Sequence, residues 1–75
     1  MTAHPRVVSN PLVMFGKPVI EGTRITVEHV LRCLAAGDTP EQVTADHPGL
    51  TIESIRTAQL FAAEHLGREA VFAAE

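Results

Sequence analysis

The chain has 75 residues, a formal net charge of -3 at pH 7 and 45% hydrophobic residues. This length excludes two independent cores, and this apolar content excludes a natively disordered chain, so we expect one small domain. The single cysteine, Cys33, excludes an internal disulfide. Because neither a disulfide nor a four-ligand metal cluster can reinforce so small a core, we expect at least a homodimer.

The apolar runs of the sequence are too short for a membrane-spanning helix, which needs roughly 20 residues. The longest run covers only residues 70–74. The first residues lack the apolar segment of a secretion signal. We therefore expect a cytoplasmic protein that does not enter a membrane, and the free thiol agrees with that compartment.

Residues 1–25 are predicted to form an N-terminal β-arm or hairpin. β-branched residues gather in 6–9 and 19–25, and turn-forming residues bound both stretches. Three basic residues against one acidic residue give this arm a charge of +2, which leaves -5 for the rest of the chain. Because a two-stranded ribbon is marginal in water, the arm must lie on the helices or pair with the arm of another chain.

Three helices are predicted in residues 26–66. The first covers 27–36, between a Thr26 N-cap and Gly37, and the second covers 40–46 behind a capping box that starts at Thr39. The third covers 52–66, from a Thr51 N-cap to a stop at Gly67. At helical spacing, the expected core faces of the first and third helices are Val27, Val30, Leu31, Leu34 and Ala35, and Ile52, Ile55, Ala58, Ala62, Ala63 and Leu66.

A short helix, a tight turn and a longer helix form the outline of a helix-turn-helix, with the first helix as support. Many three-helix domains share this outline without binding DNA, so the side chains must decide. The third helix offers few groups that read bases, and its glutamates repel phosphate. The arms of a dimer could supply the missing positive charge. The candidate DNA-binding residues are Arg6, Lys17, Arg24, Ser54, Arg56 and Thr57.

Leu60 and Phe61 lie largely off the apolar stripe of the third helix. Either the arm covers them, or they form an interface with another subunit or partner, because a small domain seldom leaves two such side chains in water. The tail, residues 67–75, is either a docking segment or a frayed end. The candidate interface residues are Val7, Phe15, Val19, Ile20, Leu60, Phe61, Val71 and Phe72.

Catalytic and cofactor chemistry find little support in the sequence. His29 and Cys33 are one helical turn apart, but a surface pair provides neither an oxyanion hole nor a pocket, and two metal ligands are not four. The spacing of His47 and His65 does not complete such a site, so solvated histidines are expected. Gly16-Lys17 lacks the other residues of a phosphate-binding loop. We expect no enzyme, no cofactor and no bound metal.

Two groups of residues resemble the small prokaryotic family known as domain of unknown function 433. The more specific is the stretch Gly16-Lys17-Pro18-Val19-Ile20-Glu21-Gly22-Thr23-Arg24-Ile25-Thr26-Val27. The other is the succession of Leu31 to Gly37, Thr39-Pro40-Glu41, His47-Pro48-Gly49-Leu50-Thr51 and Ile52-Glu53-Ser54-Ile55. Phe15 stands where the family often has a second glycine, which puts a Gly-Gly turn in doubt and suggests insertion into a dimer seam.

The resemblance implies a homeodomain-like helix-turn-helix fold behind a β-arm that can contribute to dimerisation. It also implies the role of antitoxin to a PIN-like nuclease toxin, and it leaves open binding to operator DNA. The alternative is a self-associating interaction module without a DNA role. Independently of the family, Gly22 is expected to adopt a backbone conformation closed to other residues, with Thr23 and Thr26 bonded to the backbone at the corner before the first helix. Arg24 is expected to pair with Glu28 or to contact phosphate.

Overall fold

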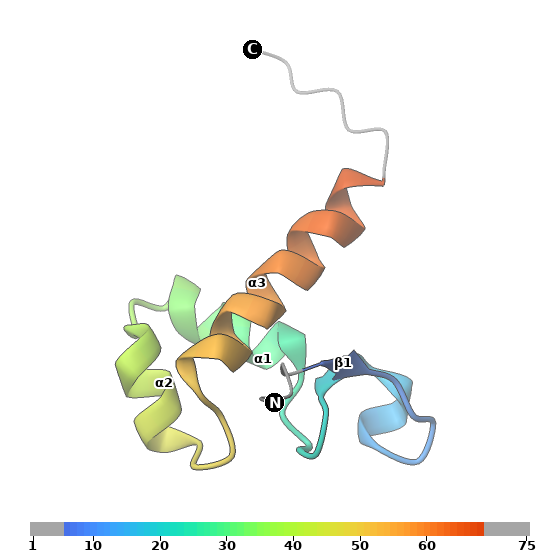
Figure 1. Cartoon of the computed structure of the whole chain (residues 1–75), viewed down its shortest axis with the longest axis horizontal. Helices are drawn as coiled ribbons and strands as arrows, with labels where there is room; N and C mark the ends of the chain where they lie inside the picture. The colour runs from blue at the N-terminus through green and yellow to red at the C-terminus, as the bar shows by residue number, and fades with distance from the viewer. Residues whose placement is uncertain (1–5, 69–75) are drawn as a thin grey trace, which may run out of the picture.

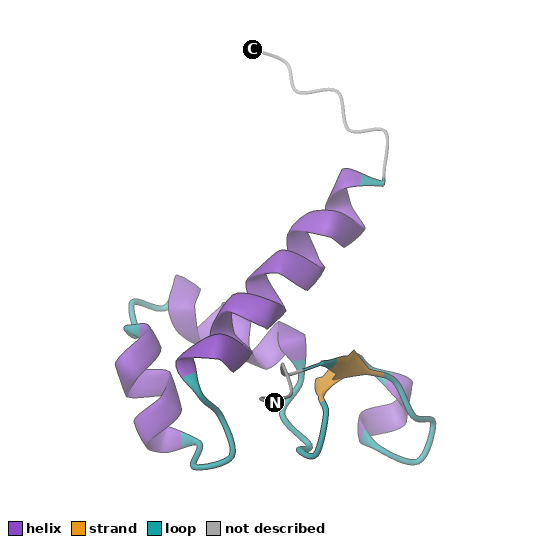
Figure 2. Ribbon diagram, in the orientation of Figure 1, coloured by secondary structure: helices purple, strands orange, loops and turns teal. Residues whose placement is uncertain are grey.

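A two-stranded hairpin precedes three helices in the computed structural model, which describes residues 6–68. The elements are β1 (Val7–Val8), the single turn η1 (Met14–Gly16), β2 (Val19–Ile20), α1 (Val27–Ala35), α2 (Pro40–Asp46) and α3 (Ile52–Gly67). Figures 1 and 2 show α2 and the hairpin at opposite ends of the group, with α3 rising away from it. The prediction of a mainly helical chain behind a short hairpin is confirmed. No helix in residues 6–68 is both long enough and apolar enough to cross a membrane.

The two strands are shorter than the predicted stretches 6–9 and 19–25. Beyond Ile20 the chain turns, because Gly22 takes a φ of +82° and the Ile20 amide donates to the Ile25 carbonyl at 3.0 Å. Residues 21–25 are therefore a tight turn instead of a strand. The strands pair antiparallel, with Val7 opposite Ile20 and Val8 opposite Val19.

Two threonines hold the corner between β2 and α1, as the sequence predicts. Thr23 Oγ1 donates to the Ile20 carbonyl at 2.8 Å and accepts from the Ile25 amide at 3.0 Å. Thr26 Oγ1 accepts from the His29 amide at 2.9 Å and so caps α1. These bonds satisfy backbone groups that the turn removes from the sheet, and they fix the direction in which α1 begins.

The predicted starts of α2 and α3 are confirmed in atomic detail. Gln42 N donates to Thr39 Oγ1, and Thr39 N donates to Gln42 Oε1, which completes the capping box. At α3 the same exchange joins Thr51 and Ser54. Gly37 ends α1 with a φ of +106°, the left-handed conformation predicted for it.

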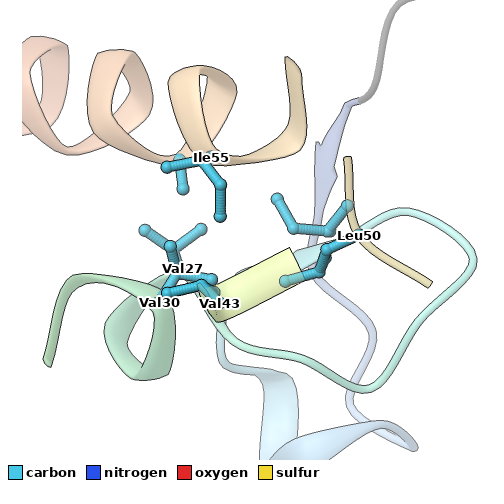
Figure 3. Close-up of a cluster of buried hydrophobic side chains, with 7 residues drawn as sticks. Val27, Val30, Val43, Leu50 and Ile55 are labelled. Atoms are coloured by element: carbon cyan, nitrogen blue, oxygen red, sulfur yellow. The ribbon is translucent and has the colours of Figure 1, made fainter. Parts of the chain in front are cut away.

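One apolar core joins the hairpin to all three helices. Figure 3 shows Ile55 of α3 facing Val27 and Val30 of α1, with Val43 of α2 and Leu50 of the following turn beside them. Val19 and Ile20 of β2 are only 2% exposed, and Ile20 belongs to this cluster. The prediction that Val19 and Ile20 form an interface is therefore wrong in this fold, since the chain's own core takes up both side chains.

The packing of α3 on this core is complete only in its first half, and Phe61 is the partly buried residue that continues it. Ile55 and Ala58 are buried, but Leu60 and Leu66 remain 60% and 59% exposed, and Ala63 is exposed as well. Figure 1 shows the reason, because the second half of the helix extends past the other elements. The predicted core faces of α1 and α3 are therefore too long at their C-terminal ends, because Ala35, Ala63 and Leu66 are exposed.

The tip of the hairpin has an unusual backbone. Met14, Phe15 and Gly16 take φ values of 49°, 56° and 81° in succession. This left-handed region suits glycine and is rare for bulky side chains. Phe15 therefore takes a conformation of the glycine type, although its side chain is 96% exposed and gains no burial within the chain.

Replacing Phe15 tests how much this backbone conformation lowers the free energy of unfolding. We expect Phe15→Gly to be more stable than Phe15→Ala by about 1 kcal/mol, because both variants lose the ring but only alanine keeps the Cβ atom that opposes a positive φ. Urea unfolding followed by circular dichroism measures the difference. Equal stability of the two variants would show that Phe15 is not held in the left-handed region in solution.

Candidate functional site

An apolar groove lies between α1 and α3 and is called here the α1–α3 groove. It has a volume of about 550 Å³. The protruding half of α3 forms one wall, and the outer face of α1 forms the other. Its lining residues are Lys17, Pro18, Val27, Glu28, Leu31, Arg32, Ala35, Phe61, Ala62, His65 and Leu66.

Helical spacing places the apolar groups of the groove. On α1, Leu31 and Ala35 follow Val27 at intervals of four residues, so the three side chains form one row. On α3, Phe61 is half-buried against the core, and its ring stacks on His65 with centroids 5.7 Å apart. The result is a concave apolar surface that ends in the exposed side chain of Leu66.

A chain of ion pairs forms one rim of the groove. Glu28 of α1 accepts from Lys17 Nζ at Oε1, 3.0 Å away, and lies 3.0 Å from Arg32 Nη2 at Oε2. The hydrogen bond from Lys17, followed by that from Arg32, lowers the pKa of Glu28 below its ordinary value of 4.5. The carboxylate thereby ties the loop before β2 to α1. Of the two alternatives for Arg24, the pair with Glu28 is not formed, because Lys17 and Arg32 are the partners of this carboxylate; contact with phosphate stays a prediction.

On the other side of this rim lies a hollow of about 410 Å³ that is more polar than the α1–α3 groove, and it is called here the basic pocket. Three of the six lysine and arginine residues of the chain and two of its four histidines line it. Glu28 is the acidic group among them. Positive charge is thus concentrated here, although the whole chain is acidic. The lining residues are Met14, Lys17, Arg24, Ile25, Thr26, Glu28, His29, Arg32 and His47.

The two histidines of the basic pocket contact each other, which the sequence did not predict. His47 Nδ1 lies 3.0 Å from the Val43 carbonyl oxygen, and because that oxygen only accepts, Nδ1 donates. In a neutral ring Nε2 of His47 is then the acceptor for Nε2 of His29, 3.2 Å away. His29 Nε2 also lies 3.5 Å from Cys33 Sγ. Within residues 6–68 no three His, Cys, Asp or Glu side chains are arranged to hold a metal ion.

No spacing rule could have found the His29–His47 pair. The two residues lie 18 positions apart, on α1 and at the end of α2, and only the packing of these helices brings them together. By contrast, the His29–Cys33 contact follows the one-turn spacing noted in the sequence.

The structure divides the predicted DNA-binding residues among three places. Lys17 and Arg24 lie in the basic pocket, whereas Arg6 and Thr57 line a separate small hollow between β1 and α3. Arg56 is paired with Glu53 on α3 at 3.5 Å. Ser54 is 3% exposed and caps α3, so the prediction that it contacts DNA is wrong. The predicted set does not form one surface.

The predicted interface residues also separate. Phe15 and Leu60 are exposed, as an interface requires. Val7 and Phe61 are half-buried against the core and lie together in the hollow between β1 and α3, so the arm covers part of α3. The predicted cover by the arm is thus seen in part for Phe61, whereas Leu60 stays 60% exposed and its interface remains a prediction. Val71 and Phe72 lie outside the described residues.

Comparison with known proteins places the chain in a family. Residues 7–62 match the family model described as protein of unknown function (DUF433). The chain belongs to the DUF433 family. It is also 38% identical over 68 residues to the uncharacterized protein y4eO of Sinorhizobium fredii (strain NBRC 101917 / NGR234). That match takes in 88% of this DUF433 chain but only 31% of y4eO, so the chain spans about a third of its relative. No solved structure matches it.

Acid titration tests the rim of ion pairs in this DUF433 protein. A lowered pKa means that Glu28 stabilises the fold fully above its unfolded-state pKa and loses that contribution as the pH falls through its lower folded-state pKa. We therefore expect Glu28→Gln to lose less thermal stability than the parent chain between about pH 6 and about pH 3. Lys17→Met removes the larger cause of the shift and should act in the same direction. If the melting temperatures of the parent chain and of E28Q fall by the same amount between these two pH values, the ion pairs do not contribute to stability in solution.

Proposed function

We propose that this chain is a non-catalytic, antitoxin-like protein that binds and neutralises a PIN-like nuclease toxin. The observation that carries this proposal is the α1–α3 groove. A domain of this size usually covers its large apolar side chains, yet Leu31, Phe61 and Leu66 here border an open concave surface. Such a groove suits an amphipathic helix, which would place side chains spaced three and four residues apart along it.

The chemistry of the groove and of the whole chain supports the same proposal. The net charge of -3 favours association with a basic partner, and nucleases that bind RNA present such surfaces. The rim contributes little net repulsion, because Lys17, Glu28 and Arg32 already neutralise one another in part. The resemblance to the family supplies the type of partner, and the groove supplies a place for it.

A matched pair of variants tests the groove. Ala35 and Ala45 are both exposed alanines in the last two residues of a helix, but only Ala35 lines the groove. When the chain is co-expressed with a PIN-like nuclease, taken from a neighbouring gene where one is found, we expect Ala35→Asp to weaken co-purification and inhibition of RNA cleavage at least about tenfold, since it places a charge on the apolar wall. Ala45→Asp should preserve both.

Two results would overturn the nuclease proposal. One is the absence of a nuclease gene beside this one together with no effect of the chain on PIN-like nucleases. The other is a parent chain that sediments as a dimer sensitive to A35D and binds no nuclease, in which case a self-associating module is the better description. A homodimer that leaves the groove open is compatible with the nuclease proposal, and we propose such a dimer to cover the exposed Phe15 and Leu60.

Operator binding is a second candidate function. The order of α2, the turn at residues 47–51 and α3 favours it, because this is the order of a helix-turn-helix. The start of α3 disfavours it, since Ser54 is buried and Arg56 is engaged by Glu53. Affinity for operator DNA would therefore come largely from contacts with the DNA backbone, and not from contacts with bases.

A mobility-shift assay with the promoter region tests this second function. If the chain is a repressor, it should bind the promoter at low salt and lose affinity steeply between about 50 and about 200 mM salt, as counterion release requires. Ala35→Asp should leave that binding intact if the groove serves the nuclease. No shift at the lowest salt would exclude operator binding and leave the nuclease proposal untouched.

A further inference from the structure

We propose that the basic pocket binds a phosphate group. The pocket brings together Lys17 and Arg24 from the segments flanking β2, His29 and Arg32 from α1, and His47 from the end of α2. The acidic group facing them is Glu28, which Lys17 and Arg32 already engage. This inference is independent of the nuclease proposal, because it concerns the opposite side of the ion-pair rim from the apolar wall.

Hydrogen-bond donors remain available after the internal contacts are counted. Arg24 is exposed, and its guanidinium forms no ion pair or hydrogen bond with a residue in 6–68. Arg32 directs Nε and Nη2 at Glu28, which leaves both N–H groups of Nη1 and one of Nη2. Lys17 has three ammonium hydrogens and gives one to Glu28. The pocket can therefore offer several charged donors to one anion.

Two of the three cations are already fixed in place, because Glu28 holds Lys17 and Arg32. His29 and His47 line the pocket beside them but give their ring N–H groups to His47 Nε2 and to the Val43 carbonyl. A ligand then needs to order little more than the side chain of Arg24, and preorganisation of this kind favours binding. The pocket is also formed by three separate segments, so its composition depends on the folded arrangement.

The number and direction of the donors favour phosphate over a carboxylate. One arginine satisfies both oxygens of a carboxylate through a single fork. Phosphate has more acceptor oxygens, points them in several directions and carries up to two charges, so it can use donors that converge from different elements. A pocket of about 410 Å³ has room for the group and for part of the molecule that carries it.

Titration with inorganic phosphate tests the proposal on the full chain. Ionic strength is held constant with sodium chloride, and the ring signals of His29 and His47 are followed by nuclear magnetic resonance. We expect a saturable shift of both rings, with affinity reduced about tenfold or more in Arg24→Gln. Arg56→Gln changes the net charge equally but lies outside the pocket on α3, so it should bind phosphate like the parent chain.

The source of the phosphate is distinguished by a second arm, in which a short DNA duplex replaces inorganic phosphate. If the duplex shifts the signals of the same two rings, and Arg24→Gln weakens that response, the nucleic-acid backbone is the source. If inorganic phosphate binds and the duplex gives no response, the source is a small phosphorylated molecule. Arg24→Lys serves if Arg24→Gln is poorly folded, and it should bind less tightly than the parent because it loses the planar fork. The proposal is overturned if neither probe gives a saturable shift, or if R56Q weakens binding as much as R24Q.

Discussion

Close contact between α1 and α3 is the constraint on which the rest of this structure depends. Val30 and Ala58 are both 0% exposed, and Ile55 beside them is 1% exposed. All three belong to one buried cluster, and a small residue such as alanine lets packed helices approach closely. Because β2 and α2 add Ile20 and Val43 to the same cluster, moving α3 would expose side chains from β2 and from the other two helices.

The length of α3 extends this contact into the α1–α3 groove. The helix runs for 16 residues, but its buried residues all lie at or before Ala58. The remaining turns carry Phe61 at the edge of the core and Leu66 beyond it, and with Ala62 they form one wall of the α1–α3 groove. The groove is thus a direct consequence of a helix that is longer than the core beneath it.

Glu28 separates two surfaces of opposite character. On one side of its ion pairs lies the apolar groove, and on the other lies the basic pocket. Since Glu28 binds Lys17 as well as Arg32, it also fixes the hairpin relative to α1 and thereby places residues of the arm on both surfaces. A partner in the groove and an anion in the pocket would therefore meet at the same three side chains, which gives the two proposed sites a physical means of influencing each other.

The sequence by itself determined the local structure of this protein, including the three helices, their threonine caps, Gly22 and Gly37 in left-handed conformations and the corner built from Thr23 and Thr26. These features depend on residues within a few positions of one another, and caps and turns have specific side-chain requirements. Only the tertiary structure decided that Val19 and Ile20 enter the core, that Ser54 is a buried cap, that Glu28 binds Lys17, and that His47 reaches His29. Those outcomes depend on which faces meet when the helices pack, and neither hydrophobic period nor charge spacing along a single element specifies a partner on another element.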